Sequence, residues 1–147
     1  AKIGVYGLSL GGYTAALLSC FEPKLDCVIA GIPATDFAEL LELHMPQETR
    51  RELFHYDISD QNVTESYAVV SPLAMPSLVP CEKKYIFCGT ADRIVPPGNS
   101  MKIWQHWGQC QLEWYHGGHL TFRNSSKVRR FINRALREQG FIGQSVL

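Results

Sequence analysis

Three residues of this chain have the types and the chain order that nucleophilic catalysis requires: Ser9, Asp92 and His119. Ser9 is the central residue of GLSLG, a G-x-S-x-G pattern that follows a short apolar run and precedes an Ala/Leu-rich segment. A serine hydroxyl becomes a nucleophile when a base removes its proton, and the base needs an acid to orient it. The three residues therefore predict acyl transfer through a covalent intermediate.

The segment around Ser9 predicts a tight turn between a strand at about residues 3–6 and a helix over residues 12–20. Glycine lacks a Cβ, so we expect Gly7 and Gly11 to provide the room that such a turn needs. The turn would expose the Ser9 hydroxyl at the end of the strand. The first backbone N–H groups of the helix would then face a bound substrate.

Asp92 and His119 each follow a predicted strand of their own. The apolar residues 85–88 lead into GTADRIVP, which contains Asp92, and residues 111–115 lead into HGGH, which ends at His119. The carboxyl ends of parallel strands meet at one edge of a sheet, where ligands bind. We therefore expect the three side chains to converge at that edge.

A second acidic residue competes with Asp92. Asp36 follows another predicted strand, at residues 27–30, so it is a second candidate for the acid. However, Asp36 and Glu39 have the spacing of a capping box at the start of a helix. The sequence therefore favours a capping role for Asp36 and the catalytic role for Asp92.

His116 competes with His119 for the role of base. His116 lies nearer the strand end, whereas His119 follows two glycines that allow the loop to turn toward the serine, and His119 is preferred. The two residues also form a His-x-x-His pair. No third ligand accompanies that pair, so no metal site is expected.

The motifs GLSLGG, GTADRIVP and GGH together resemble the three site motifs of the α/β-hydrolase superfamily, with a spacing similar to its serine esterases, lipases and dipeptidyl-type peptidases. The resemblance covers nearly the whole chain and begins at the nucleophile strand. It implies Ser9 as nucleophile, Asp92 as acid and His119 as general base and acid. It also implies the Leu10 backbone N–H as one oxyanion-hole donor. The implied reaction is hydrolysis of a carboxylic ester, thioester or amide, with esters preferred because no peptide-selecting domain is visible.

The superfamily normally has several strands before the nucleophile strand, and a loop among them supplies the second oxyanion donor. Nothing before Lys2 resembles such strands, so we expect an incomplete domain whose partner is a missing N-terminal half. Loss of one oxyanion donor costs ~10²–10³ in turnover. The chain alone could therefore be inactive, and an open sheet edge favours self-association.

The alternation of strands and helices predicts an α/β-hydrolase fold over residues 1–147, with a mostly parallel sheet of about four strands. Residues 36–76 are predicted to form a helical insert, which the resemblance identifies as a cap. Within the insert, helices are expected near residues 37–44, 48–54 and 65–70. Further helices are expected at residues 100–107 and from about residue 125 to Gly140. Four side chains of the insert are candidates for lining an acyl pocket, with packing onto the sheet as the alternative for each: Phe37, Met45, Phe54 and Tyr56.

The composition argues against several classes of function. Lys and Arg together number 14 and so do Asp and Glu, so neither nucleic acid nor an anionic membrane surface is an expected partner. No apolar run approaches the ~20 residues of a membrane span. The five cysteines are an odd number without a Cys-x-x-Cys pair, which favours buried reduced thiols and a cytoplasmic location.

The expected partner is therefore a small-molecule acyl substrate, and no cofactor is expected. Two other functions remain open from the sequence. An acyltransferase would use the same triad and replace water by an alcohol or amine. A non-catalytic hydrolase fold would serve as a binding module.

Overall fold

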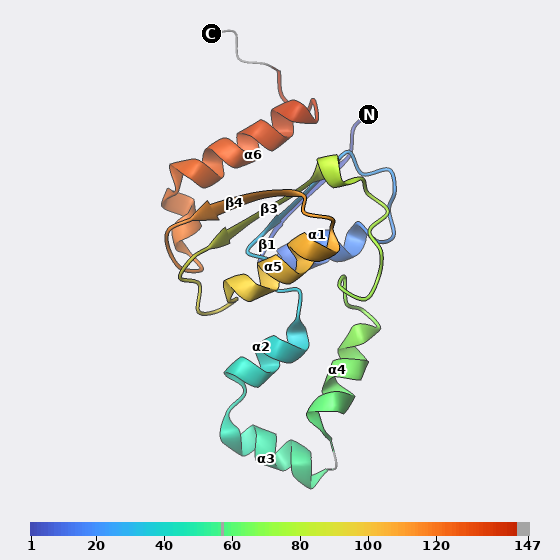
Figure 1. Ribbon diagram of the computed structural model, residues 1–147, viewed down its shortest axis with the longest axis vertical. Helices are drawn as coiled ribbons and strands as arrows, with labels where there is room; N and C mark the ends of the chain where they lie inside the picture. The colour runs from blue at the N-terminus through green and yellow to red at the C-terminus, as the bar shows by residue number, and fades with distance from the viewer. Residues whose placement is uncertain (57, 144–147) are drawn as a thin grey trace.

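The computed structural model describes residues 1–56 and 58–143, and a four-stranded parallel sheet lies at its centre (Figure 1). The strands lie side by side in chain order and all neighbouring pairs are parallel. They are β1 (Gly4–Leu8), β2 (Cys27–Gly31), β3 (Lys84–Gly89) and β4 (Gln111–Tyr115). The predicted α/β class is therefore confirmed, and each predicted strand agrees with the observed one to within two residues at either end.

Helices cover both faces of the sheet, which is why the central strands β2 and β3 are buried along their whole length. The covering helices are α1 (Leu10–Leu18), α5 (Pro97–His106) and α6 (Ser126–Glu138). Along β2, Val28 and Ala30 pack with α1 and α5, whereas Cys27 and Ile29 pack with α6. This alternation follows from the two-residue period of a strand. Ser125 caps the start of α6, and Gly140 follows its end with a φ of 70°.

The insert between β2 and β3 forms three helices that extend away from the sheet (Figure 1). They are α2 (Phe37–His44), α3 (Gln47–His55) and α4 (Asp60–Ala68), and together we call them the cap. The prediction of a last cap helix over residues 65–70 is wrong at its start. Ser59 and Asn62 form a capping box that begins α4 five residues earlier. Two short 3₁₀ helices complete the structure, Cys81–Lys83 and Thr121–Asn124.

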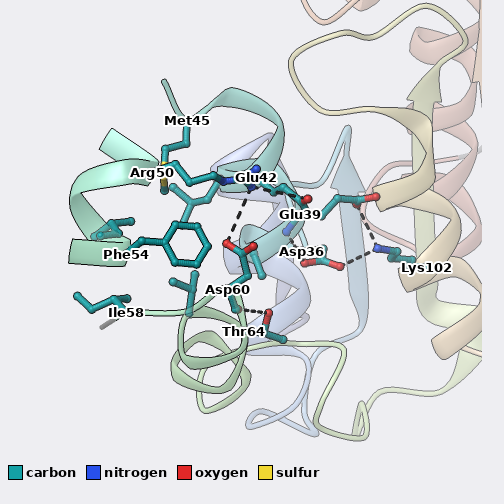
Figure 2. Close-up of a pocket in the computed structure, with 14 residues that line it drawn as sticks. Asp36, Glu39, Glu42, Met45, Arg50, Phe54, Ile58, Asp60, Thr64 and Lys102 are labelled. Carbon is teal, nitrogen blue, oxygen red and sulfur yellow. Dashed lines mark hydrogen bonds and ion pairs between the residues drawn. The ribbon is translucent and has the colours of Figure 1, made fainter. Parts of the chain in front are cut away.

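A polar junction holds the cap against the sheet domain. Asn99 of α5 is fully buried, accepts a hydrogen bond from the Asp36 backbone N–H at 2.9 Å and donates one to Glu39 Oε2 at 2.8 Å. Lys102 Nζ lies 2.7 Å from Asp36 Oδ2 and 3.1 Å from Glu39 Oε2, as Figure 2 shows. Burial alone would raise the pKa of Asp36. The hydrogen bonds from Lys102 and from the Glu39 backbone outweigh burial and lower this pKa.

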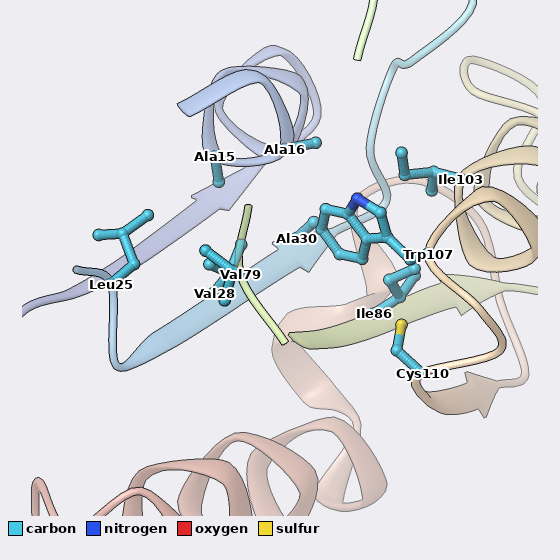
Figure 3. Close-up of a cluster of buried hydrophobic side chains, with 10 residues drawn as sticks. All are labelled: Ala15, Ala16, Leu25, Val28, Ala30, Val79, Ile86, Ile103, Trp107 and Cys110. Carbon is cyan, nitrogen blue, oxygen red and sulfur yellow. The ribbon is translucent and has the colours of Figure 1, made fainter. Parts of the chain in front are cut away.

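The apolar core on the α1 and α5 side is shown in Figure 3. Trp107 is buried there beside Ile86 and Ile103. All five cysteines are free thiols, and four of them are buried. No helix in the described part of the chain combines the length and the apolar character that crossing a bilayer would require.

Candidate active site

Ser9 occupies the sharp turn that joins β1 to α1. Its φ is 55° and its ψ is −114°, a conformation that costs a non-glycine residue about 1–3 kcal/mol. Two backbone hydrogen bonds fix the turn: the Ser9 N–H donates to the Gly31 carbonyl at 2.9 Å, and the Ala34 N–H donates to the Ser9 carbonyl at 3.2 Å. The surrounding structure therefore holds Ser9 in this strained conformation.

The glycines around Ser9 have different roles in this turn. A Cβ on Gly7 would lie 2.0 Å from the Gly11 carbonyl oxygen, so Gly7 is required as predicted. A Cβ on Gly11 would meet no atom within 4 Å, so the expectation that Gly11 must be glycine is wrong. Gly12 is the second required position, because its Cβ would lie 2.8 Å from the Gly31 carbonyl oxygen and 3.0 Å from Pro33 Cα. Glycine is needed here because α1 packs closely against the backbone at the end of β2 and just after it.

The structure pairs Asp92 with His119. His119 Nδ1–H donates to Asp92 Oδ2 at 2.7 Å, and the two side chains are only 11% and 1% exposed. The other carboxylate oxygen of Asp92 accepts from the backbone N–H groups of Ile94 at 2.9 Å and Val95 at 3.0 Å. These donors hold the carboxylate in one orientation, and the His119 tautomer assigned by this geometry leaves Nε2 as the basic nitrogen.

Backbone contacts between the loops after β3 and β4 bring this pair together. The Thr90 N–H donates to the Tyr115 carbonyl and the Ala91 N–H donates to the Gly117 carbonyl, both at 3.0 Å. Gly117 has a φ of 148°, and a Cβ there would lie 2.0 Å from Thr121 Oγ1. The first glycine of the GGH motif thus permits the turn that places His119 over Asp92.

The side chains around the Asp92–His119 pair are buried. Burial raises the pKa of Tyr115 to about 12, and the nearby Asp92 carboxylate adds to that rise. Burial likewise raises the pKa of the Cys88 thiol to about 12, against a lowering by the Ser100 hydroxyl and with a further rise from Asp92. A charge-assisted hydrogen bond is stronger in such an environment than in water.

Ser9, Asp92 and His119 all follow the carboxyl ends of parallel strands, namely β1, β3 and β4. They therefore lie along the same edge of the sheet. No hydrogen bond joins Ser9 to His119 in this structure, which describes both residues. The structure thus contains the Asp92–His119 hydrogen bond but no hydrogen bond between Ser9 and His119.

The backbone at the start of α1 offers donors beside Ser9. The first backbone N–H of α1 with a carbonyl partner is that of Tyr13, which donates to the Ser9 carbonyl at 3.0 Å. The amides of Leu10, Gly11 and Gly12 donate to no backbone carbonyl among the described residues. The Leu10 N–H that the resemblance implied as an oxyanion donor is therefore available, and it lies at the positive end of the helix.

The competing residues have other roles in the structure. Asp36 Oδ1 accepts from the Glu39 backbone N–H at 3.0 Å, which confirms the predicted capping role, although Glu39 binds Asn99 and Lys102 instead of completing the box. His116 is exposed. Among residues 1–56 and 58–143, no three His, Cys, Asp or Glu side chains come close enough to hold a metal ion.

The four candidate pocket residues do not share one pocket. Met45 and Phe54 line a cavity inside the cap. Phe37 packs its ring against Tyr13 of α1 and Tyr67 of α4, with centroids 4.7 and 5.5 Å away. Tyr56 is 76% exposed and belongs to a separate surface hollow. Five well-defined cavities among the described residues are lined by none of Ser9, Asp92 and His119.

One contact near the pair was not predicted from the sequence. His44, at the end of α2, lies with its Nε2 2.7 Å from the carbonyl oxygen of Ile94, whose N–H binds Asp92. Leu40 of the same helix packs with Val95. The cap therefore touches the loop that holds the acid. The helical spacing of Leu40 and His44 signalled a shared face, but not its partner.

Comparisons with known proteins agree with this architecture. No protein-family model matches the chain. Two curated proteins from two strains of Mycobacterium tuberculosis, both named only as uncharacterized, are 40% identical over 144 residues, which cover 95% of this chain. The chain spans 33% of the length of these relatives.

Solved structures show the same fold at low sequence identity. An acetyl xylan esterase from Paenibacillus sp. R4 is 20% identical, with a TM-score of 0.68 over 89% of this chain and 45% of the esterase. A mutant puromycin hydrolase complexed with PGG is 20% identical, with a TM-score of 0.74 over 100% of this chain and 23% of the hydrolase. The Pyrococcus horikoshii acylaminoacyl peptidase is 17% identical, with a TM-score of 0.65 over 95% of this chain and 23% of the peptidase.

Proposed function

We propose that this chain, which has the α/β-hydrolase fold, carries the catalytic triad of a serine hydrolase that cleaves a carboxylic ester. The observation that carries the proposal is the buried hydrogen bond of 2.7 Å between His119 Nδ1 and Asp92 Oδ2. That pair lies at the same sheet edge as the strained turn of Ser9. A buried His–Asp pair can activate the hydroxyl of a serine at the same sheet edge.

In the proposed reaction, Ser9 Oγ attacks the ester carbonyl carbon while His119 Nε2 takes the hydroxyl proton. Asp92 holds the imidazole ring in place and stabilises the imidazolium that forms. The Leu10 backbone N–H stabilises the oxyanion. His119 then gives its proton to the leaving alcohol, and water attacks the acyl-enzyme with His119 again as base.

Rotation of the Ser9 side chain meets no opposing hydrogen bond. Ser9 Oγ is free of hydrogen bonds to the described residues, so rotation of its side chain costs no existing bond. Catalytic hydrogen bonds are often long or absent before substrate binds, and they tighten in the complex. The missing Ser9–His119 bond is therefore compatible with the proposed triad.

The preference for an apolar acyl group comes from the side chains next to the triad. Leu10, Ile94 and Leu120 follow Ser9, Asp92 and His119 by one or two positions, and they are 60%, 53% and 64% exposed. Large apolar side chains that remain exposed in this way mark contact surfaces for a ligand or another protein segment. An ester with an apolar acyl chain would cover them.

The test is hydrolysis of a series of p-nitrophenyl esters by the whole protein, since the chain spans a third of its relatives. Asp92→Asn should lower kcat by about 10³–10⁴-fold, because it leaves the imidazole in the wrong tautomer. Asp36→Asn and His116→Ala are the matched controls and should retain activity, whereas Ser9→Ala and His119→Ala should lose it. Equal losses for Asp36→Asn and Asp92→Asn would contradict the assignment.

A further inference from the structure

The cap contains a cavity of about 330 Å³ that is separate from the proposed triad, and Figure 2 shows its lining. Side chains of α2, α3 and α4 form most of the wall, and Lys102 of α5 closes one side. A volume of this size holds a small organic molecule. The cavity therefore could bind a ligand independently of hydrolysis.

One side of the cavity is apolar. Met45, Phe54 and Ile58 lie together on the side away from the sheet in Figure 2. Phe54 is 58% exposed and Ile58 is 39% exposed, so the described residues leave much of their apolar surface uncovered. Covering that surface with an apolar group is favourable by roughly 25 cal/mol per Å².

Arg50 supplies the polar side, and its hydrogen bonds are incomplete. Its Nε and Nη2 are buried, and neither has an acceptor among the described residues. These two N–H groups lie on the same edge of the guanidinium, which presents two parallel donors. A buried donor without an acceptor is destabilising, so a ligand that supplies the acceptor removes this cost.

The charge of Arg50 is already balanced. Its Nη2 lies 3.6 Å from Glu42 Oε1 and 3.9 Å from Asp60 Oδ1, which is within range for ion pairs but too far for hydrogen bonds. Lys102 is paired in the same way with Asp36 and Glu39. Among the described residues, the lining thus carries four carboxylates against two cations, and a further anion would be repelled. What Arg50 lacks is an acceptor, not a negative charge.

We propose that the cap cavity binds an uncharged molecule that joins an apolar group to an amide or ester carbonyl. The apolar group covers Phe54 and Ile58, and the carbonyl oxygen accepts from Nε–H and Nη2–H of Arg50. A carbonyl oxygen has two lone pairs and can accept both donors. Because 34% of the Arg50 side chain remains exposed, a rotation of this side chain presents the buried edge to the ligand.

Phenylacetamide and phenylacetate test this proposal, since they have nearly the same shape and differ in charge. Binding is measured by ligand-observed NMR titration in a Ser9→Ala background, where turnover by the proposed triad does not interfere. Phenylacetamide should bind, and phenylacetate should bind at least about tenfold more weakly. Equal binding of the two compounds, or no binding of the amide, would overturn the proposal.

Arg50→Lys keeps the charge and removes the paired donors, so it should weaken phenylacetamide binding about tenfold. Arg51→Lys is the matched control. Arg51 is the next residue on α3 but lines a different hollow, and its replacement should leave binding unchanged. Equal effects of the two substitutions would contradict the role of Arg50.

Asp60→Asn provides a second test that does not depend on the folding of the arginine variant, because the Asp60 side chain is 67% exposed. Removing this negative charge should strengthen phenylacetate binding several-fold and leave phenylacetamide binding nearly unchanged. If phenylacetate binding does not change, the charge argument is wrong. A failure of ester hydrolysis would not bear on either result, because none of the triad residues lines the cavity.

Discussion

At the scale of single residues, the strained turn at Ser9 depends on a few backbone positions more than on its side chains. Ser9 is held at a φ of 55° by hydrogen bonds to Gly31 and from Ala34. The strain is tolerated because α1 packs against β2 and holds the backbone in this conformation. Gly12 allows that packing, since its Cα faces the backbone of Gly31 and Pro33.

The two glycines after Leu10 should respond in opposite ways to a methyl group. Gly12→Ala should destabilise the protein by about 1–3 kcal/mol, because the atoms it meets belong to the backbone. Gly11→Ala faces open space and should stabilise α1 by roughly 0.5–1 kcal/mol. Urea denaturation of both variants measures the free energies of unfolding. Two variants of equal stability would show that α1 does not pack as described.

At the scale of elements, the junction between α2 and α5 couples the cap to the sheet domain through charge. Lys102 lies between Asp36 and Glu39, and Asn99 fixes the same two acidic residues from the buried side. Desolvation alone would lower the pKa of Lys102, but the hydrogen bonds that Lys102 donates to Asp36 and Glu39 raise it. The pKa of Asp36 is lowered.

These shifts predict the pH range in which the junction stabilises the fold. The lowered pKa of Asp36 gives stability that is present above the unfolded pKa of about 3.9 and is lost as pH falls through the folded pKa. The raised pKa of Lys102 gives stability that is present below about 10.4 and is lost as pH rises through the folded pKa.

Asp36→Asn keeps a good helix cap and removes the charge. The difference in Tm between the natural protein and Asp36→Asn should therefore be largest near neutral pH and shrink below about pH 4. Thermal unfolding followed by circular dichroism across this range measures it. A difference in Tm that stays constant down to acid pH would show that the carboxylate charge adds nothing.

Sequence patterns predicted the elements better than their contacts. The apolar runs of β2 and β3 and the spacing of Asp36 and Glu39 are local signals, and the structure confirms what they indicated. The Asp92–His119 hydrogen bond agrees with their expected positions after neighbouring strands. The contact of His44 with the Ile94 carbonyl depends on how the cap packs, and no local pattern indicates it.

Two further features could not be predicted from the sequence, because they too depend on how distant segments pack. The space beside Gly11 and the crowding at Gly12 depend on the path of the segment after β2, which lies far along the chain. The cavity around Arg50 depends on the angles among three short helices. Residue types alone identified Met45 and Phe54 as candidates, but not the arginine beside them.

At the scale of the whole molecule, the sheet has an open edge at β1. Among the described strands, β1 pairs only with β2. Ile3, just before β1, and Tyr6, within it, are 53% and 49% exposed. A free edge of this kind offers unpaired backbone groups to another chain. We propose that a strand from the rest of a longer protein covers this edge, because the relatives are about three times as long.

The chain alone should therefore self-associate through β1. Tyr6→Lys places a charge at the edge strand and should shift the chain toward the monomer in size-exclusion chromatography with light scattering. Phe21→Lys is the matched control, since Phe21 is equally apolar and 62% exposed but lies outside the sheet. A monomeric natural chain, or an equal shift in both variants, would contradict edge pairing.

The central claim is that the hydroxyl of Ser9 is an activated nucleophile. The most direct test is to treat the whole protein with a fluorophosphonate, which forms a covalent bond to an activated serine oxygen and releases fluoride, and to locate the adduct by peptide mass spectrometry. We expect the adduct on Ser9, with labelling strongly reduced in His119→Ala and retained in His116→Ala. A folded protein that stays unlabelled at Ser9, or that is labelled equally in both histidine variants, would contradict the account.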